Sequence, residues 1–207
     1  QCPYHGWRFN GAGKCQQIPS LGKNAKIPSR AKIDSYPTKE VYGLVFCFLG
    51  DAPEKERCPI MKVGEYEQEG WQTTTQYFQF DIDYKRSIEN GIDGAHNEFV
   101  HPTHGFSGED EEYKSPPIDM KETKWGTGFW SKMYAPPLKE KKMREASGRD
   151  KNAVMEAGTG HHGISMLWTH IHPTAQVFIH QYMYETPIDE DRTNLYLINT
   201  RNFLTDP

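Results

Sequence analysis

A cysteine and a histidine lie three residues apart near the start of the 207-residue chain, in the sequence Cys-Pro-Tyr-His-Gly-Trp. This spacing lets the Cys2 thiolate and the His5 imidazole reach one metal centre from a single turn. Two kinds of site use such a pair: zinc sites, and iron–sulfur clusters in which histidines replace two cysteines on one iron. Pro3 stiffens the loop, and Gly6 lets the backbone pass close to the metal. The loop therefore predicts a metal site within a small, loop-rich domain.

A second group of metal-binding side chains lies at residues 89–104, where three histidines and several carboxylates fall close together. Two histidines from one segment and a remote carboxylate form the facial triad of non-haem Fe(II) oxygenases, which leaves positions open for O₂. His96 and His101 are five residues apart, slightly more than one helical turn. Both can point inward if the helix ends or bends near Gly94. The alternative interpretation is a polar helix end with solvated histidines.

The first loop resembles the second ligand loop of a Rieske [2Fe–2S] domain, a family that pairs Cys-x-His with a later Cys-x-x-His. Tyr4 and Trp7 stand where respiratory-chain Rieske proteins have a second cysteine and a serine, so the loop is similar to the oxygenase branch. Residues 13–19 also match the oxygenase pattern. The resemblance implies that Cys2 and His5 bind the cluster and that the first ligand pair lies upstream of this sequence.

Residues 93–101 match Asp-x-x-His-x-x-x-x-His, the motif of the mononuclear iron site in Rieske oxygenases. The resemblance implies that His96 and His101 bind iron. It also implies that Asp93 carries electrons between subunits, because it would bridge an iron ligand such as His96 to a cluster ligand, His5, of the neighbouring chain.

Other polar residues bear on the same iron site. Asn90 matches a residue that the family commonly has near the iron. His104 could line the pocket, substitute as a ligand or lie in solvent, and a pocket or structural role is preferred. The resemblance implies a third ligand, an aspartate on a helix after the last strands. Asp189 and Asp191 lie in a turn, where acids are usually solvated, so we expect this ligand beyond Pro207.

The pattern of the chain predicts an α+β protein in three parts. Residues 1–52 read as a small antiparallel β domain, which the resemblance identifies as the C-terminal part of a Rieske domain. Residues 53–70 are charged and irregular, and we expect a linker there. Residues 71–207 resemble the helix-grip catalytic domain, an antiparallel sheet with helices, and we expect it to be truncated at its C-terminal end.

Apolar periodicity locates the expected elements. Tyr84, Ile88 and Ile92 recur every four positions and predict one face of a helix, which Gly91 and Gly94 weaken or kink. The expected strands are residues 41–49, 73–83, 120–135, 163–186 with a hairpin turn at Pro173, and 193–204. The expected irregular segments are a loop at residues 102–118 and an insertion at residues 137–160.

Further histidines and cysteines have weaker assignments. His170 and His172 are two residues apart on a predicted strand, so they face the same side. With Met166, Trp168 and His180 they could line a substrate cavity, although strand histidines are often merely satisfied by neighbours. We expect His161 and His162 in a loop, Cys47 buried as a free thiol in its apolar strand, and Cys15 in a structural role.

Composition narrows the classes of function. The net charge is −4 without a long basic run, so nothing in the sequence favours nucleic-acid binding. No apolar stretch reaches the roughly 18 residues of a membrane-spanning helix. The aromatic content of 13% argues against disorder. Without marks of secretion, the four cysteines favour the cytoplasm over a disulfide framework.

The resemblance implies the catalytic subunit of a Rieske oxygenase. It would contain a [2Fe–2S] cluster and mononuclear Fe(II), use O₂, and take electrons from NAD(P)H through a reductase, with or without a ferredoxin. It would form a homotrimer and hydroxylate or O-demethylate an organic substrate, which we expect to be aromatic. The alternatives are a Rieske ferredoxin, which would need only residues 1–52, and a zinc-stabilised binding module. We expect no activity from this piece alone, because neither metal site is complete in it.

Overall fold

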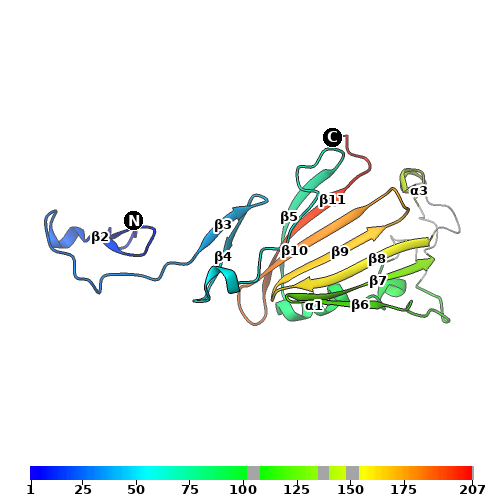
Figure 1. Cartoon of the computed structure of the whole chain (residues 1–207), viewed down its shortest axis with the longest axis horizontal. Coiled ribbons are helices and arrows are strands. Elements are labelled where there is room, and N and C mark those ends of the chain that lie inside the picture. Colours follow the sequence, from blue (N-terminus) through cyan, green and yellow to red (C-terminus); the bar gives the residue numbers. More distant parts are fainter. Residues whose placement is uncertain (102–107, 135–139, 148–153, 207) are drawn as a thin grey trace. The chain divides into compact units, whose positions relative to one another are not determined.

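The computed structural model describes residues 1–101, 108–134, 140–147 and 154–206 (Figure 1). Two compact units divide the chain, a small unit Gln1–Arg57 and a large unit Cys58–Pro207. His104 lies outside the described residues. In the described part of the chain, every helix is too short or too polar to cross a membrane.

The small unit consists of two antiparallel strand pairs joined by long loops. The pairs are β1 (Arg8–Phe9) with β2 (Cys15–Gln17), and β3 (Thr38–Val41) with β4 (Leu44–Cys47). The two 3₁₀ turns are η1 (Pro19–Leu21) and η2 (Glu54–Glu56). This is the loop-rich antiparallel arrangement that the sequence predicts.

The prediction of one continuous strand at residues 41–49 is wrong, because a hairpin turn interrupts this segment. Tyr42 and Gly43 both have positive φ, 57° and 71°, as a two-residue turn between antiparallel strands requires. β4 then alternates, with Leu44 half-buried and Val45 exposed. Cys47 falls on the exposed side, so the prediction of a buried thiol is also wrong.

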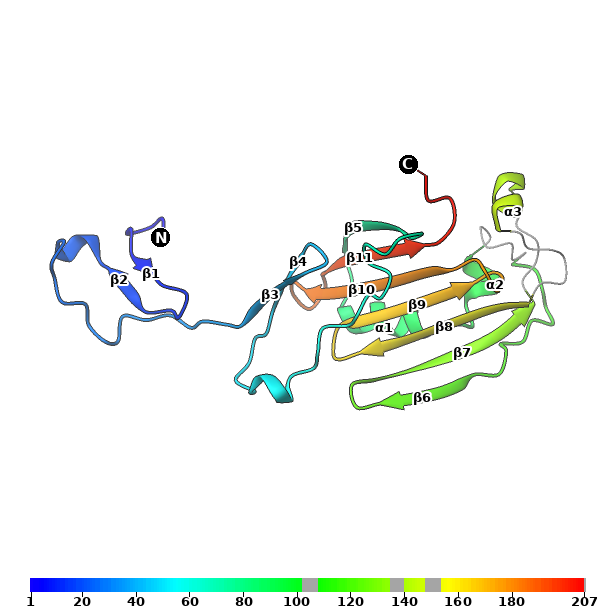
Figure 2. The same cartoon turned by 45° about the horizontal axis from the view of Figure 1, so that its top comes forward.

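The large unit is a seven-stranded antiparallel sheet with one main helix (Figure 2). Its strands are β5 (Gln72–Phe80), β6 (Asp119–Thr123), β7 (Gly126–Tyr134), β8 (Val154–His162), β9 (Met166–His172), β10 (Ile179–Pro187) and β11 (Thr193–Arg201). Its helices are α1 (Tyr84–Ile92), α2 (Asn97–Val100) and α3 (Lys141–Ser147). The α+β fold class expected from the sequence is confirmed.

The order of the strands explains where the helices lie. The sheet runs β5-β11-β10-β9-β8-β7-β6, so β5 and β6, which follow each other in sequence, form its two opposite edges. The segment between them must therefore cross the sheet, and it contains α1 and α2 (Figures 1 and 2). From β6 the chain returns strand by strand until β11 pairs with β5.

Helix α1 packs on β8, β9 and β10 through its half-buried face of Tyr84, Ile88 and Ile92, as its periodicity predicts. Gly91 is the point of closest approach, because a Cβ atom there would lie 2.1 Å from Leu167 Cδ2. This glycine was expected to weaken or kink the helix. Its observed role is to let the helix backbone lie against the sheet.

Three sequence expectations for the sheet are wrong. The insertion expected at 137–160 contains α3 and most of β8, a strand between β7 and β9. His161 and His162, expected in a loop, are the last residues of β8. The strand expected at 120–135 is a hairpin of β6 and β7. The sequence did not predict β8 because of its glycines. A Cβ atom at Gly158 would lie 2.5 Å from the Trp130 ring, so a bulky residue has no room there.

The two faces of the sheet have different coverings. The helix face contacts α1 and includes Thr159, Leu167 and Glu185. The opposite face, which we call the histidine face, includes Trp168, His170, His172, His180 and Tyr182, because cross-strand partners share a face. Residues 58–71 cover part of it. Within that segment, Met61 is buried and its carbonyl accepts a hydrogen bond from Tyr184 Oη at 3.0 Å.

Candidate metal sites

His96 and His101 bracket the single turn of α2. Helix α1 ends at Ile92, and the backbone turns before α2 begins, which is the interruption that the spacing of the two histidines requires. Both residues are half-buried, and their Nε2 atoms lie 3.0 Å apart. The local fold therefore brings two imidazole nitrogens to one point.

This pair fits one metal ion. Two nitrogen ligands at about 2.1 Å from an ion and at right angles to each other are about 3.0 Å apart. Burial, followed by the nearby His96, lowers the pKa of His101 from its usual 6.5. That imidazole is therefore neutral at pH 7 and able to coordinate. Among the described residues, no set of three or more histidine, cysteine, aspartate or glutamate side chains converges as a complete metal site.

Asp93 lies behind His96. It is the C-cap residue that follows α1, and its Oδ1 accepts a hydrogen bond from the Ala95 amide at 2.8 Å. Its Oδ2 lies 3.5 Å from His96 Nδ1, within ion-pair reach, but that buried nitrogen makes no hydrogen bond to any described residue. The Asp93 side chain is 50% exposed. The same carboxylate thus faces a candidate metal ligand and is half exposed to solvent.

Two residues near this site carried no signal in the sequence. Glu98 of α2 is buried, and its Oε1 accepts hydrogen bonds from the amides of Gly108 at 2.9 Å and Asp110 at 3.4 Å. It therefore ties α2 to the segment that follows. Burial, reinforced by the carboxylates of Glu98 and Asp93, raises the pKa of Tyr113. Its hydroxyl stays protonated beside the site. Only the folded chain shows that these side chains meet.

Asn90, and the two aspartates that the sequence analysis set aside, are exposed. Asn90 is exposed in the last turn of α1, where its carbonyl accepts from the Asp93 amide at 3.2 Å. Asp189 and Asp191 lie in the turn between β10 and β11, and Asp189 pairs with Arg192.

In the small unit, residues 2–7 form a closed turn. The Cys2 amide donates to the Trp7 carbonyl at 2.8 Å and the Gly6 amide to the Cys2 carbonyl at 3.0 Å. Gly6 has φ +71°, which a residue with a side chain rarely adopts. His5 is exposed and packs edge-on against Tyr4, with the two ring centroids 3.9 Å apart. Cys2 is a free thiol. A thiol and an accessible imidazole are thus presented by one rigid turn.

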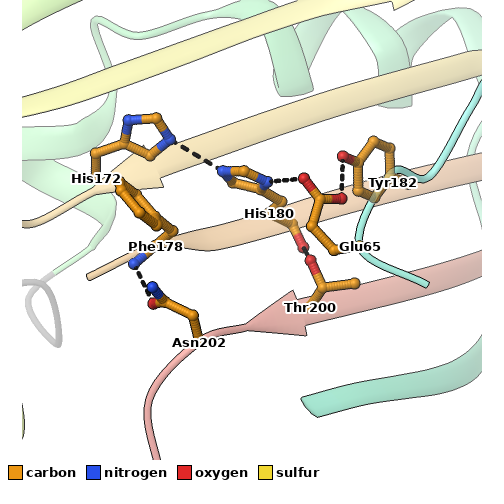
Figure 3. A network of polar contacts seen from close by, with 7 residues as sticks. All are labelled: Glu65, His172, Phe178, His180, Tyr182, Thr200 and Asn202. Atoms are coloured by element: carbon orange, nitrogen blue, oxygen red, sulfur yellow. Dashed lines mark hydrogen bonds and ion pairs between the residues drawn. The ribbon is translucent and has the colours of Figure 1, made fainter. Parts of the chain in front are cut away.

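A second histidine pair lies on the histidine face (Figure 3). His172 Nε2 and His180 Nε2 are 2.9 Å apart, and His180 Nδ1 lies 2.7 Å from Glu65 Oε1. Tyr182 Oη donates to Glu65 Oε2 at 2.7 Å. Burial works to raise the pKa of Glu65, but the hydrogen bonds from His180 and Tyr182 outweigh it and lower the pKa to about 2. The Glu65 carboxylate is therefore ionised, and each of its two oxygens has a hydrogen-bond partner.

His170 stacks on His180, with ring centroids 3.9 Å apart. Burial, followed by the nearby His180, lowers its pKa to about 3, so it is neutral. The prediction that His170 and His172 share one side is confirmed. They do so with Met166, Trp168 and His180, but on the face opposite α1.

Models of two protein families match the chain. The Rieske [2Fe-2S] domain matches residues 1–37, and the vanillate O-demethylase oxygenase C-terminal domain matches residues 80–207. The second match alone covers more than half of the sequence.

Curated relatives include oxygenase components. The toluene-4-sulfonate monooxygenase system iron-sulfur subunit of Comamonas testosteroni is 31% identical over 62% of this chain and 35% of its own length. Methylxanthine N1-demethylase of Pseudomonas putida is 31% identical over 58% of this chain and 33% of its own. The chloroplastic protein TIC 55 of Arabidopsis thaliana is 31% identical over 54% and 21%. The matched parts span about a third of these relatives or less.

Solved structures share the fold. Dicamba monooxygenase bound to 3,6-dichlorosalicylic acid gives a TM-score of 0.78 at 21% identity, covering 100% of this chain and 61% of that chain. The caffeine complex of the Pseudomonas putida NdmA protein gives 0.75 at 23%, covering 100% and 57%. With both family models matched in order along the sequence, the chain belongs to the Rieske-type non-haem iron oxygenases, and its large unit to the vanillate O-demethylase oxygenase C-terminal family.

Proposed function

We propose that this chain is the larger part of a terminal oxygenase component. It uses O₂ and electrons supplied by a reductase to hydroxylate or O-demethylate an organic, aromatic substrate. The observation that carries the proposal is the convergence of His96 Nε2 and His101 Nε2 to 3.0 Å, with the Asp93 carboxylate behind the first imidazole. A Rieske ferredoxin would have no use for this arrangement.

In this proposal His96 and His101 hold a mononuclear iron, and a carboxylate from outside the described residues completes the set. The bound iron supplies the activation of O₂. His96 then coordinates through Nε2, so its Nδ1 carries the hydrogen and faces Asp93. Across the 3.5 Å to His96 Nδ1, the charge of the Asp93 carboxylate favours this tautomer. His101 coordinates as a neutral imidazole, which its lowered pKa favours.

Asp93 serves as the bridge for electrons between subunits. Its Oδ1 is held by the Ala95 amide, which fixes the carboxylate, while half of the side chain stays exposed. Cys2 and His5 hold the [2Fe–2S] cluster, and the exposed His5 ring is accessible to a carboxylate of another chain. A path that runs from His5 of one chain to Asp93 of the next requires an oligomer, and we propose a homotrimer.

The proposal extends to partners and compartment. Two relatives are named for the monooxygenation of toluene-4-sulfonate and the demethylation of methylxanthines, which favours a small ring substrate. NAD(P)H would supply electrons through a reductase, directly or by way of a ferredoxin. All four cysteines are free in the structure, as a reducing compartment such as the cytoplasm maintains.

The test is Asp93→Asn in the full-length protein. The amide keeps the size of the side chain and the bond to the Ala95 amide but removes the charge that faces His96. We expect iron and sulfide contents to be retained and turnover to fall by roughly 100-fold. After reduction, the cluster should stay reduced in the presence of O₂ and substrate, which absorption spectroscopy follows.

The matched control is Asp189→Asn, which changes an exposed aspartate in the β10–β11 turn and should turn over normally. Normal turnover in Asp93→Asn would contradict the bridging role. Loss of the mononuclear iron in that variant would instead make Asp93 a metal ligand.

A further inference from the structure

Strand β8 contacts the end of α1 through one buried hydroxyl. Thr159 Oγ1 lies 2.8 Å from the carbonyl oxygen of Gly91, in the last turn of the helix. The last four carbonyls of a helix have no partner within it, so this part-buried bond satisfies a carbonyl that the helix itself leaves without one. Thr159 itself is 8% exposed.

Two carbonyls, those of Gly91 and Trp168, can accept the single hydrogen of the Thr159 hydroxyl, and Gly91 at 2.8 Å is the nearer acceptor. Thr159 Oγ1 also lies 3.1 Å from Thr169 Oγ1 and 3.0 Å from the Trp168 carbonyl. A hydroxyl has one hydrogen to donate and two lone pairs to accept with. When Thr159 donates to Gly91, the Thr169 hydroxyl donates to Thr159, and the three groups form a short chain that ends on the helix.

Close packing at Gly91 brings the helix backbone within reach of the Thr159 hydroxyl. The close approach of Gly91 to Leu167, which is 1% exposed, brings the helix backbone within reach of a strand side chain. Earlier in the helix, Ser87 Oγ donates to Glu185 Oε1 at 2.8 Å. The two hydrogen bonds hold α1 at separate points, and the one from Thr159 holds its C-terminal turn.

We propose that Thr159 is a positioning residue for the iron site. The backbone leaves α1 at Ile92, Asp93 follows directly, and His96 lies only three residues further. An anchored Gly91 carbonyl therefore sets where this segment starts, whereas a fraying last turn would let Asp93 and His96 shift together. The inference rests on the proposed function for the role of iron, but the anchoring can be measured without it.

The experiment compares full-length Thr159→Val, which removes the hydroxyl and keeps the shape, with Thr159→Ser, which keeps the hydroxyl. Thr159→Ala runs in parallel and removes the hydroxyl without placing a new methyl in the core. The matched control is Thr200→Val, because Thr200 is fully buried and its hydroxyl bonds the His180 carbonyl on the histidine face. Two readouts are taken: hydrogen exchange of the amides at residues 90–95, and retention of mononuclear iron against a chelator.

We expect Thr159→Val and Thr159→Ala to exchange these amides faster and to lose iron roughly tenfold faster. Thr159→Ser and Thr200→Val should both keep the wild-type rates of amide exchange and of iron loss. Unchanged exchange in both hydroxyl-free variants would overturn the anchor. Faster exchange with normal iron retention would overturn the positioning role. A wild-type chain with normal protection of residues 90–95 but no mononuclear iron would overturn the proposed function, and with it the assigned role of the anchor.

Discussion

Two histidine pairs in the large unit have almost the same geometry and different surroundings. The Nε2 atoms are 3.0 Å apart in His96–His101 and 2.9 Å apart in His172–His180. Either distance fits a hydrogen bond as well as two ligands of one ion. The distance alone therefore does not separate a metal site from a structural network.

The carboxylate behind each pair makes the difference. Glu65 lies 2.7 Å from His180, its side chain is 15% exposed, and Tyr182 occupies its other oxygen. Asp93 lies 3.5 Å from His96 and is 50% exposed. The His172–His180 pair belongs to a closed hydrogen-bond network that joins residues 58–71 to the sheet. Behind the His96–His101 pair, by contrast, the carboxylate is half exposed and stands further from the imidazole. The distance and exposure of the carboxylate behind a histidine pair, rather than the distance within the pair, therefore separate the two sites.

The largest effect should come from removing one histidine from each pair. In the full-length protein, His96→Ala should lose the mononuclear iron and more than roughly 100-fold of turnover, because a ligand matters more than the residues behind it. His172→Ala should keep the iron. Metal analysis and product formation measure both. Equal iron loss in the two variants would remove the distinction between the pairs.

Next in size is Glu65→Gln, which breaks the closed network. His180 and Tyr182 both direct a hydrogen towards the carboxylate, and an amide offers only one acceptor oxygen. We expect a loss of about 3 kcal/mol in the free energy of unfolding, with iron retained. Urea unfolding followed by tryptophan fluorescence measures this in the large unit, since only Trp7 of the five tryptophans lies outside it.

The control for that variant is Glu156→Gln on the same face. Glu156 pairs with Lys132 at 2.9 Å, but its side chain is 43% exposed. An exposed pair contributes less than about 1 kcal/mol. A similar cost for the two substitutions would show that the Glu65 network is no more than a surface contact.

The histidine face should also make stability depend on pH. The pKa of His170 is about 3 in the folded chain and 6.5 without the fold, so the unfolded chain binds more protons between these values. Stability from this group therefore falls as the pH drops, by about 3 kcal/mol between pH 8 and pH 4. His170→Phe should remove that part of the slope in urea unfolding curves. An unchanged slope would mean that His170 already titrates near its usual pKa.

The helix face should show the opposite sign, with a smaller effect. Burial raises the pKa of Glu185 from 4.5 to about 7, although the hydrogen bond from Ser87 opposes the shift. The folded chain then binds more protons, and stability falls as the pH rises, by about 2 kcal/mol between pH 5 and pH 7. Glu185→Gln should remove this loss, measured as a difference from wild type in the same unfolding assay. A Gln variant with the wild-type pH dependence would contradict the raised pKa.

The sequence predicted the features that depend on local spacing. The period of Tyr84, Ile88 and Ile92 placed α1, and alternation placed His170 and His172 on one side of a strand. It could not show which face of the sheet that side belongs to. The path of the segment between β5 and β6 decides this point, because α1 covers the other face.

Features that depend on a distant partner were missed. The glycines of β8 indicate a loop until Trp130 and Trp168 are seen to fill the space beside them. Glu65 lies in a charged segment that was taken for a linker, and only the folded chain brings it to His180. The convergence of His96 and His101 was predictable because five residues and one turn of helix separate them.

The central claim is that His96 and His101 hold a mononuclear iron and that His172 and His180 do not. The most direct measurement is the ratio of iron to acid-labile sulfide in the full-length protein. The wild type and His172→Ala should contain about three irons for every two sulfides, and His96→Ala about two for two. An unchanged ratio in His96→Ala, or a lowered one in His172→Ala, would contradict the assignment of the iron site.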